Sequence, residues 1–275
     1  MVKVAKTKTA SKANSKTEDS PLMVRSVDKA FKVLDVFVRC GHSLSLTALA
    51  SELGVDKSTA QRFSYTLEHF GYLKRNPATK HFELGIKVLD LGYGFLYSNT
   101  LLKSAMPYLM HLSRETEETI NITMRDGVEI VFVSRFMSRH LFNTDVTVGT
   151  RMPVYCTAPG IAILSKLPRA EAIKLLEQCD RQKITENTTW EIGALKEKLE
   201  ISDARGYATA FEEVYLDDIS ISAPIFDASF PVAAVTISVS RVRFTPEEAE
   251  ARFAPLVVAA ARSISNSAPL KRKTS

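Results

Sequence analysis

The residues best suited to recognition chemistry lie in LTALASELGVDKSTAQRFSYTLEHFGYL, residues 46–73. The second half of this segment has a helical pattern whose outward side chains recur at i, i+3, i+4 and i+7. These side chains are Ser58, Gln61, Arg62 and Tyr65, with Lys57 and Thr59 at the N-terminal end. Arginine can fork onto guanine and glutamine onto adenine, while serine, threonine and lysine can hold phosphates. The pattern favours a helix that enters a DNA groove, although the solvated face of an ordinary three-helix bundle would carry similar residues.

Three helical patterns and a hairpin around this face predict a winged helix-turn-helix over residues 22–84. The first helix covers residues 25–40, and its expected buried face consists of Val27, Ala30, Phe31, Leu34 and Phe37. Thr47 is expected to cap the second helix, and Gly54 to end it. The third helix should run to about Phe70, with Ala60, Phe63, Leu67 and Phe70 as its buried stripe.

A strand-turn-strand pattern in YLKRNPATKHFEL predicts the wing of this domain. Arg75 and Lys80 lie beside its turn, where cations can reach phosphates. The expected DNA-binding set is therefore Arg25, Thr47, Lys57, Ser58, Thr59, Gln61, Arg62, Tyr65, Arg75 and Lys80.

The composition is that of a globular protein, since 45% of the 275 residues are hydrophobic and 24% are charged. No run of 18 or more apolar residues exists, so we expect no membrane partner. Residues 1–20 lack the apolar core of a secretory signal and predict a disordered basic arm, while residues 266–275 form a basic tail. Three cysteines without pairing or metal-ligand spacing predict a cytoplasmic protein with no metal and no cofactor.

The charge is unevenly distributed along the chain. Residues 1–100 carry 15 Lys and Arg against 9 Asp and Glu, a net charge of +6, whereas residues 101–270 carry 18 against 22, a net charge of −4. A basic first third beside an acidic remainder indicates that one part meets a polyanion, although a difference of this size also arises by chance.

Residues 100–265 predict a separate α+β domain, connected to the first by a linker helix over residues 85–99. Alternating strand patterns flank the Asp126-Gly127 hairpin signal, and a second strand pair, ISISAPIF and FPVAAVTISVS, surrounds a short turn. More strand is expected in HLFNTDVTVGTRMPVY, and helices in GIAILSKL, RAEAIKLLEQ and TWEIGALKEKLEISDAR. The last helix should start at Thr245-Pro246-Glu247-Glu248, which has a capping threonine and a glutamate three residues on.

Several segments resemble the IclR family of bacterial transcription regulators. RSVDKAFKVLDVF, residues 46–73 and FELGIKVLDLG resemble its DNA-binding domain, and GTRMPVYCTAPGIAILS and GYATAFEEVYLDDISISAPIFDASFPVAAVTISV resemble its effector-binding domain. The resemblance implies a winged helix-turn-helix, a linker helix and a C-terminal GAF/profilin-like effector-binding domain. It also implies dimers or tetramers that bind palindromic operators in double-stranded DNA and respond to a small organic acid effector.

The residues expected to bind the effector come partly from this resemblance. In TRMPVYCTAPGIAIL a helix starts near Gly160, and N–H groups at a helix start, beside a hydroxyl, suit a carboxylate. The family places effector contacts in this loop and on the last two strands, which here correspond to Thr157, Ala158, Pro159, Gly160, Asp218, Ser220, Thr236 and Ser238. The serine and threonine hydroxyls would equally well hydrogen-bond to one another within a packed sheet.

Three departures from the family pattern bear on the effector. Ile161 stands where Lys or Arg often follows the loop glycine, Pro159 stiffens the loop, and Asp217-Asp218 replaces a common Gly-Val. An extra carboxylate facing the cavity would repel an acid unless a cation such as Arg151 or Arg135 compensates.

Together these features predict a non-enzymatic, dimeric or tetrameric regulator of a catabolic operon, acting as repressor or activator. Phe142 and Tyr155 would add aromatic walls to the cavity, which favours an aromatic acid. Two alternatives stay open: a second domain that is only an oligomerisation platform, or a small-molecule enzyme whose winged helix binds protein. An enzyme would use Cys156 beside the helix start, but no histidine is close in sequence, and we expect a buried, inert thiol.

Overall fold

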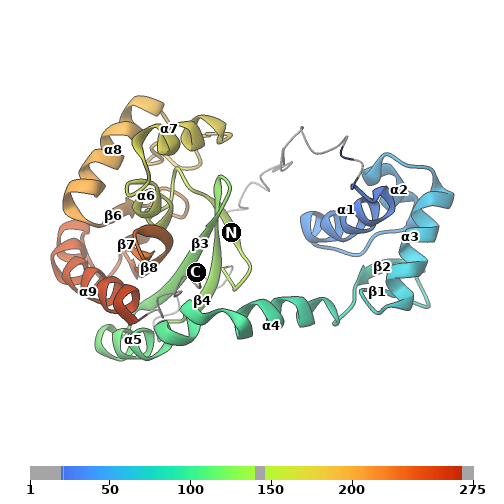
Figure 1. The fold of residues 1–275 in the computed structure, drawn as a ribbon, viewed down its shortest axis with the longest axis horizontal. Coiled ribbons are helices and arrows are strands. Elements are labelled where there is room, and N and C mark those ends of the chain that lie inside the picture. The colour runs from blue at the N-terminus through green and yellow to red at the C-terminus, as the bar shows by residue number, and fades with distance from the viewer. Residues whose placement is uncertain (1–19, 21, 140–145, 268–275) are drawn as a thin grey trace, which may run out of the picture. The chain divides into compact units, whose positions relative to one another are not determined.

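The computed structural model of the protein describes residues 20, 22–139 and 146–267. The expected arm, apart from Ser20, lies outside the described residues, as do the tail beyond residue 267 and Phe142. The chain divides into two compact units, residues 1–98 and 99–275, each with its own hydrophobic core (Figure 1).

The first unit is a winged helix-turn-helix. Its elements are α1 (Arg25–Cys40), α2 (Leu46–Leu53), α3 (Lys57–His69), β1 (Leu73–Arg75), β2 (Phe82–Leu84) and α4 (Val88–Ser98). Strands β1 and β2 pair antiparallel as the wing, and Leu44 forms a further bridge to Phe82. The predicted order of helices and hairpin is confirmed, and the predicted linker helix begins at Val88 rather than at residue 85.

Local backbone chemistry sets the ends of these helices. Gly41 and Gly54 adopt left-handed conformations, with φ of 68° and 64°, and end α1 and α2. Ser45 caps α2, since its hydroxyl oxygen accepts a hydrogen bond from the Ala48 N–H at 3.2 Å. The expectation that Thr47 caps this helix was wrong, because the helix already begins at the residue before it.

The core of the first unit lies between its helices and the wing. Its buried side chains include Val33, Val36, Phe37, Leu44, Leu49, Ala60, Leu67, Leu73 and Phe82. The expected buried face of α1 was right at its C-terminal end, where Phe37 is buried and Leu34 packs against the core, but wrong at Val27 and Phe31, which are 50% and 58% exposed. Phe70 is also exposed, because it lies at the C-cap of α3, past the last helical residue.

The second unit is an α+β domain built on a six-stranded antiparallel sheet. Its elements are α5 (Thr100–Thr116), β3 (Thr119–Asp126), β4 (Glu129–Phe136), β5 (Arg151–Pro153), α6 (Ala158–Leu164), α7 (Arg169–Gln178), α8 (Ile192–Arg205), β6 (Ala208–Phe211), β7 (Asp218–Asp227), β8 (Phe230–Ser240) and α9 (Pro246–Ser267). The strand order is β5-β4-β3-β8-β7-β6. Both predicted hairpins are confirmed, whereas β6 was not predicted and β5 comprises only three residues of the expected strand.

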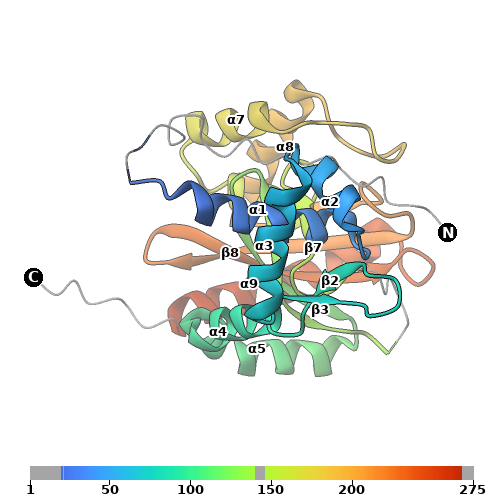
Figure 2. The ribbon, with the colours of Figure 1, turned by 90° about the vertical axis from the view of Figure 1, so that its right-hand side faces the viewer.

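Helices cover both faces of this sheet (Figures 1 and 2). Helices α5 and α9 lie along one face, and α6, α7 and α8 lie on the other side. Successive strand residues point to opposite faces, so the apolar residues of β3, β7 and β8 point toward α5 and α9. These buried residues are Ile120, Ile122, Ile219, Ile221, Ile237 and Val239. The alternate residues, which are mostly polar, point toward α6.

The start of α9 has the predicted capping box. The Thr245 N–H donates to the Glu248 carboxylate at 2.9 Å, and the Glu248 N–H donates to the Thr245 hydroxyl at 3.2 Å. This reciprocal pair fixes where the helix begins. In the part of the chain that the structure describes, no helix is both long and apolar enough to cross a membrane.

Replacing Ser45 tests the capping arrangement of the helix-turn-helix. We expect Ser45→Ala to destabilise the first unit by about 0.5–2 kcal/mol, because the Ala48 N–H loses its acceptor. Thr47→Ala is the matched control and should leave stability nearly unchanged, since Thr47 is exposed and the cap lies two residues earlier. Calorimetric unfolding of the full chain measures both changes. A larger effect from Thr47 than from Ser45 would contradict the arrangement.

Candidate nucleic-acid interface and ligand cavity

The outward face of α3 carries the side chains that the sequence placed there. Ser58, Gln61, Arg62 and Tyr65 are all exposed, as is Lys57 at the first helical position. The opposite face of the helix packs into the core, so these side chains project into solvent from a fixed support. A face of hydrogen-bonding and cationic groups on the second helix of a helix-turn-helix is suited to a DNA major groove.

Thr59 has a different role from its neighbours on α3. The Asp56 carboxylate caps this helix, accepting from the Thr59 N–H at 2.8 Å and from the Thr59 hydroxyl at 2.6 Å. This hydrogen bonding lowers the pKa of Asp56, so its carboxylate is charged at neutral pH. Thr59 thus helps to fix the start of the helix that presents Arg62, and its phosphate contact stays a prediction.

The wing turn is held by side-chain hydrogen bonds that leave its cations at the surface. The Asn76 side-chain oxygen accepts from the N–H groups of Ala78 and Thr79 at 2.9 and 3.1 Å. Arg75 lies over the Phe82 ring, with its guanidinium carbon 5.4 Å from the ring centre. Lys80 is exposed, with a left-handed φ of 61°. Arg25 and Thr47 are exposed as well, on α1 and α2.

The first unit also exposes a large amount of apolar surface on α1 and α4. No residue of α4 is buried. The exposed apolar side chains on and next to α4 are Ile86, Leu89, Leu91, Tyr93, Phe95 and Tyr97, and those of α1 are Val27, Phe31 and Val38. Exposed apolar patches of this kind mark protein contacts in soluble proteins.

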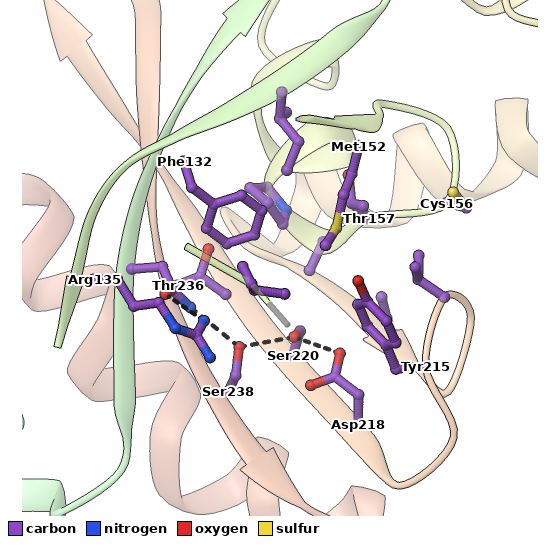
Figure 3. Close-up of a pocket in the computed structure, with 17 residues that line it drawn as sticks. Phe132, Arg135, Met152, Cys156, Thr157, Tyr215, Asp218, Ser220, Thr236 and Ser238 are labelled. Atoms are coloured by element: carbon purple, nitrogen blue, oxygen red, sulfur yellow. Dashed lines mark hydrogen bonds between the residues drawn. The ribbon is translucent and has the colours of Figure 1, made fainter. Parts of the chain in front are cut away.

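The second unit contains a cavity between the polar face of the sheet and the start of α6 (Figure 3). It is lined by Asn121, Ile130, Phe132, Arg135, Val146, Met152, Cys156, Thr157, Ala158, Pro159, Ala210, Val214, Tyr215, Asp218, Ser220, Thr236 and Ser238. The space that the centre of a water molecule can reach inside it is about 50 Å³, several times the 10–15 Å³ needed for one water. The predicted effector residues therefore line one cavity, apart from Gly160.

Strand register brings the polar lining residues into line. Asn121 lies opposite Arg135 on β4 and Thr236 on β8, and Ser220 lies opposite Ser238. A register shift between Ile122 and Thr123 adds one residue to β4, and this shift turns Arg135 toward Asn121. Without the bulge, Asn121 would face Ser134, and the cavity would lack a cation.

A continuous chain of hydrogen bonds joins these side chains along the cavity floor (Figure 3). Arg135 Nη1 donates to Asn121 Oδ1 at 3.0 Å, and Asn121 Nδ2 donates to Ser238 Oγ at 3.4 Å. The Ser238 and Ser220 hydroxyls lie 3.0 Å apart, and Ser220 donates to Asp218 Oδ2 at 2.9 Å. Thr236 pairs with Ser222 at 2.9 Å. The hydroxyls therefore bond to one another and also line the cavity, and their contact with an effector stays a prediction.

Four expectations about the cavity need correction. Gly160 does not line it: a Cβ there would lie 2.2 Å from the Val154 carbonyl oxygen, so the glycine allows close packing. Tyr155 is buried outside the cavity, and its hydroxyl donates to the Gln182 carbonyl at 2.9 Å. Arg151 is held on the surface by Asp126 and Glu129, so it is not the compensating cation. Asp217 is exposed and does not line the cavity.

The sequence analysis missed most of the cavity walls. Phe132 and Tyr215 are its aromatic walls, and Met152 and Val146 add apolar surface. Asn121 had a usable signal, since it is a polar residue within the apolar strand pattern INITMR. No comparable signal identifies the apolar wall residues, because any strand or loop core carries them.

The loop before α6 offers fewer donors to a carboxylate than the sequence suggested. The Thr157 hydroxyl donates to the Pro153 carbonyl at 3.0 Å, and Pro159 has no N–H. Arg135, which is a donor only, is the cation in the cavity lining. Burial lowers the pKa of Arg135, opposed by the charge of Asp218, but a guanidinium stays protonated in proteins.

Two titratable groups in the cavity have strongly shifted pKa values. Burial raises the pKa of Asp218 to about 7, against the opposing effects of the Ser220 hydrogen bond and the Arg135 charge. Asp218 therefore exists in both protonation states near neutral pH. Burial also raises the pKa of the Cys156 thiol to about 12, so this cysteine stays protonated and unreactive.

Two buried glutamates fix the segment that forms the outer wall of the cavity. Glu213 pairs with Lys198 and accepts from the Thr189 N–H at 3.0 Å. Glu212 pairs with Arg241 and accepts from the Asp217 N–H at 3.0 Å. Val214, Tyr215 and Asp218 follow directly in the chain, so these pairs determine where that wall lies.

A winged helix-turn-helix with exposed hydrogen-bonding and cationic side chains on α3, in one chain with a cavity-bearing α+β domain, is the arrangement of a transcription regulator with an effector-binding domain. The family model "IclR helix-turn-helix domain" matches residues 26–77, and "Bacterial transcriptional regulator IclR C-terminal" matches residues 94–266. The chain belongs to the IclR family of bacterial transcriptional regulators.

Individual relatives agree with this assignment. HTH-type transcriptional regulator KdgR of Escherichia coli K12 is 30% identical over 254 residues, covering 92% of this chain and 96% of KdgR. The crystal structure of Thermotoga maritima IclR has a TM-score of 0.68 at 28% identity, over 88% of this chain and 98% of that one. An IclR homologue from Microbacterium hydrocarbonoxydans, solved with 4-hydroxybenzoate, shares the fold, with a TM-score of 0.74 at 19% identity over 88% and 98%. The protein is thus a regulator and not an enzyme.

The pKa of Asp218 gives a measurable pH dependence of stability. Because this pKa is raised in the folded state, its stabilising contribution is fully present below about pH 3.9 and is lost as the pH rises through about 7. Asp218→Asn, which keeps an acceptor for Ser220, should therefore melt roughly 2–4 °C above the parent protein at pH 8, and the gap should close toward pH 5.

Asp217→Asn is the matched control for this prediction. Asp217 is exposed and has a left-handed φ of 64°, a conformation that asparagine tolerates, so its melting profile should follow the parent at every pH. Arg135, Tyr215 and Cys156 line the same cavity as Asp218 and are unchanged in both variants. Parallel pH profiles for the parent and Asp218→Asn would show that Asp218 does not titrate in this range.

Proposed function

We propose that the protein regulates a catabolic operon and that a small organic acid, bound in the cavity of the second unit, controls its DNA binding. The observation that carries the proposal is the cation Arg135 in a largely apolar cavity, on the same chain as the exposed α3 face. A guanidinium in such a place attracts a carboxylate, and shielding from water strengthens the attraction. Because it acts on chromosomal DNA, we expect the protein to work in the cytoplasm.

We further propose an aromatic acid as the effector. Phe132 and Tyr215 provide aromatic surfaces on the cavity walls, and Met152 provides a polarisable contact. The structural relative from Microbacterium hydrocarbonoxydans, which shares the fold, was solved in complex with the aromatic acid 4-hydroxybenzoate. Apolar walls with one cation suit a flat apolar body that ends in a carboxylate.

Self-association follows from the same proposal. The exposed apolar side chains of α1 and α4 suit burial against a second copy of the chain. Paired winged helices would read a palindromic operator, with half-sites about 34 Å or a multiple apart. An effector that binds one arrangement of the dimer better than another would shift the spacing of the two α3 helices, and so the affinity for the operator.

One observation favours a second candidate, in which the second unit only holds subunits together. The polar floor satisfies itself internally, since Ser220 pairs with Ser238 and Ser222 with Thr236. A cavity of this kind can stay closed and bind no ligand. The two candidates differ in a single property, namely whether any small molecule stabilises the second unit.

Thermal-shift screening separates these candidates. Screening the full chain against benzoates, phenylacetates and short keto and hydroxy acids should give a hit, with about 2.7 kcal/mol of stabilisation at a hundredfold excess over Kd. That corresponds to a rise in melting temperature of roughly 5–10 °C. Arg135→Gln should weaken ligand affinity at least tenfold and so reduce the rise in melting temperature. Arg151→Gln changes a surface residue and should leave that rise unchanged. No shift with any acid, together with intact DNA binding, would support the platform candidate.

Replacing Arg62 tests the DNA interface. If Arg62 reads a base, Arg62→Ala should cost about 1–3 kcal/mol on a selected operator and much less on random duplex, because the lost contact is sequence-specific. Arg39→Ala is the control, since Arg39 lies on α1 and pairs with Glu52 at 2.8 Å. Fluorescence anisotropy with both duplexes, repeated across salt concentrations, measures the effect. Equal losses on both duplexes would make Arg62 a phosphate contact, and salt-insensitive binding would rule out this surface altogether.

A further inference from the structure

The hydrogen-bond chain on the cavity floor has a fixed direction. Arg135 can only donate, and Asp218, when ionised, can only accept. Because Ser220 gives its proton to Asp218, its oxygen must accept from Ser238, whose own oxygen accepts from Asn121. Every bond between Arg135 and Asp218 therefore points the same way, from the cation toward the carboxyl group.

This direction gives the cavity two chemically opposite ends. Figure 3 shows Arg135 at one end of the floor and Asp218 at the other, with Ser238 and Ser220 between them. The walls above the floor are mainly apolar, with Phe132, Met152 and Val146 among them. A complementary ligand presents an anion to the arginine end, a hydrogen-bond donor to the aspartate end, and an apolar body between the two.

We propose that the effector is a hydroxy acid, whose carboxylate pairs with Arg135 and whose hydroxyl group donates to Asp218. This inference rests on the proposed function and narrows its ligand class from organic acids in general to acids that carry a hydroxyl donor. Ser220 already uses Asp218 Oδ2, and a carboxylate has about four acceptor positions, so a second donor can be accommodated.

A hydroxyl suits the aspartate end better than an ammonium group. Moving an ammonium ion into a largely apolar cavity costs far more than moving a neutral hydroxyl. The ligand would also bring its positive charge into a cavity that already holds Arg135. A neutral hydroxyl needs only one acceptor, and Asp218 provides it. Amino acids are therefore the comparison that tests the choice of donor.

The pKa of Asp218, about 7, adds a pH signature to this ligand class. A hydroxyl donor prefers the ionised carboxylate, so the preference for the hydroxy acid over the acid lacking the hydroxyl should grow as the pH increases from 6 to 8. An acid without the hydroxyl gains nothing from ionised Asp218 and is repelled by its charge, so its affinity should fall over the same range. Arg135, Tyr215 and Cys156 also face the cavity, but Arg135 remains charged throughout and the Cys156 thiol remains neutral.

Matched ligands test the proposal on the full-length protein by calorimetric titration. Two pairs differ only in the hydroxyl group: 4-hydroxybenzoate with benzoate, and lactate with propionate. In addition, 4-hydroxybenzoate is compared with phenol, which lacks the carboxylate, and with 4-(aminomethyl)benzoate, which carries an ammonium group. In at least one pair, the hydroxy acid should bind roughly 10- to 100-fold more tightly than the acid lacking the hydroxyl. Phenol and the ammonium compound should bind at least tenfold more weakly than 4-hydroxybenzoate if the aromatic pair is the one recognised.

Two variants test which group of the ligand binds to Arg135 and which to Asp218. Arg135→Gln should weaken both members of the recognised pair by similar factors, because both carry the carboxylate. Asp218→Asn should weaken only the hydroxy acid, leaving the other acid unchanged or bound more tightly. Arg151→Gln and Asp217→Asn are the matched controls, since neither residue lines the cavity. Operator binding by each variant checks that the chain is folded.

The outcomes separate this inference from the function on which it rests. If acids bind equally well with and without the hydroxyl, or if the ammonium compound binds best, the hydroxy-acid inference is overturned while the organic-acid effector stands. If no acid binds the parent protein, both are overturned. The pH dependence of the parent protein needs no variant: a hydroxy-acid preference that does not grow between pH 6 and 8 also counts against the role of Asp218.

Discussion

The organisation of the second unit depends on two opposite charges, Arg135 and Asp218, held inside a largely apolar cavity. Burying either charge alone is costly, because an apolar surrounding removes its hydration. The sheet offsets part of this cost by linking the two groups through the side chains of Asn121, Ser238 and Ser220, which form a chain of hydrogen bonds. Such a network stabilises the fold only when its members are satisfied, so it also fixes the register of the four strands that carry it.

The two faces of the sheet consequently contribute different interactions. The isoleucine-rich face against α5 and α9 supplies hydrophobic stabilisation, and the polar face toward α6 supplies specificity. Buried ion pairs of Glu212 and Glu213 then fix the segment that closes the cavity from the side.

The sequence predicted the elements and the residue types of both sites better than their exact positions. The α3 face and seven of the cavity residues were found because period and residue type coincide there, as in Arg62 or Ser220. Arg135 could not be placed, since a single-residue bulge between β3 and β4 decides which face it joins, and no local pattern marks that bulge. The predictions of the α2 cap and of Val27 and Phe31 as buried residues of α1 failed for a related reason. A shift of one or two residues along the chain changes which residue caps a helix or faces the core, but it barely changes the periodic pattern of the sequence.

The exposed apolar side chains of α4 bear on the stability of this helix. An isolated helix of 11 residues is marginally stable in water, because nucleation costs more than so few hydrogen bonds return. With none of its residues buried within one chain, α4 must draw its order from whatever covers its apolar side chains. In the self-association proposed above, a second copy of the chain covers these side chains, so the stiffness of this segment would vary with protein concentration. On that proposal, a cell with few copies would hold a looser regulator, and a cell with many copies a more rigid one, from the same gene product.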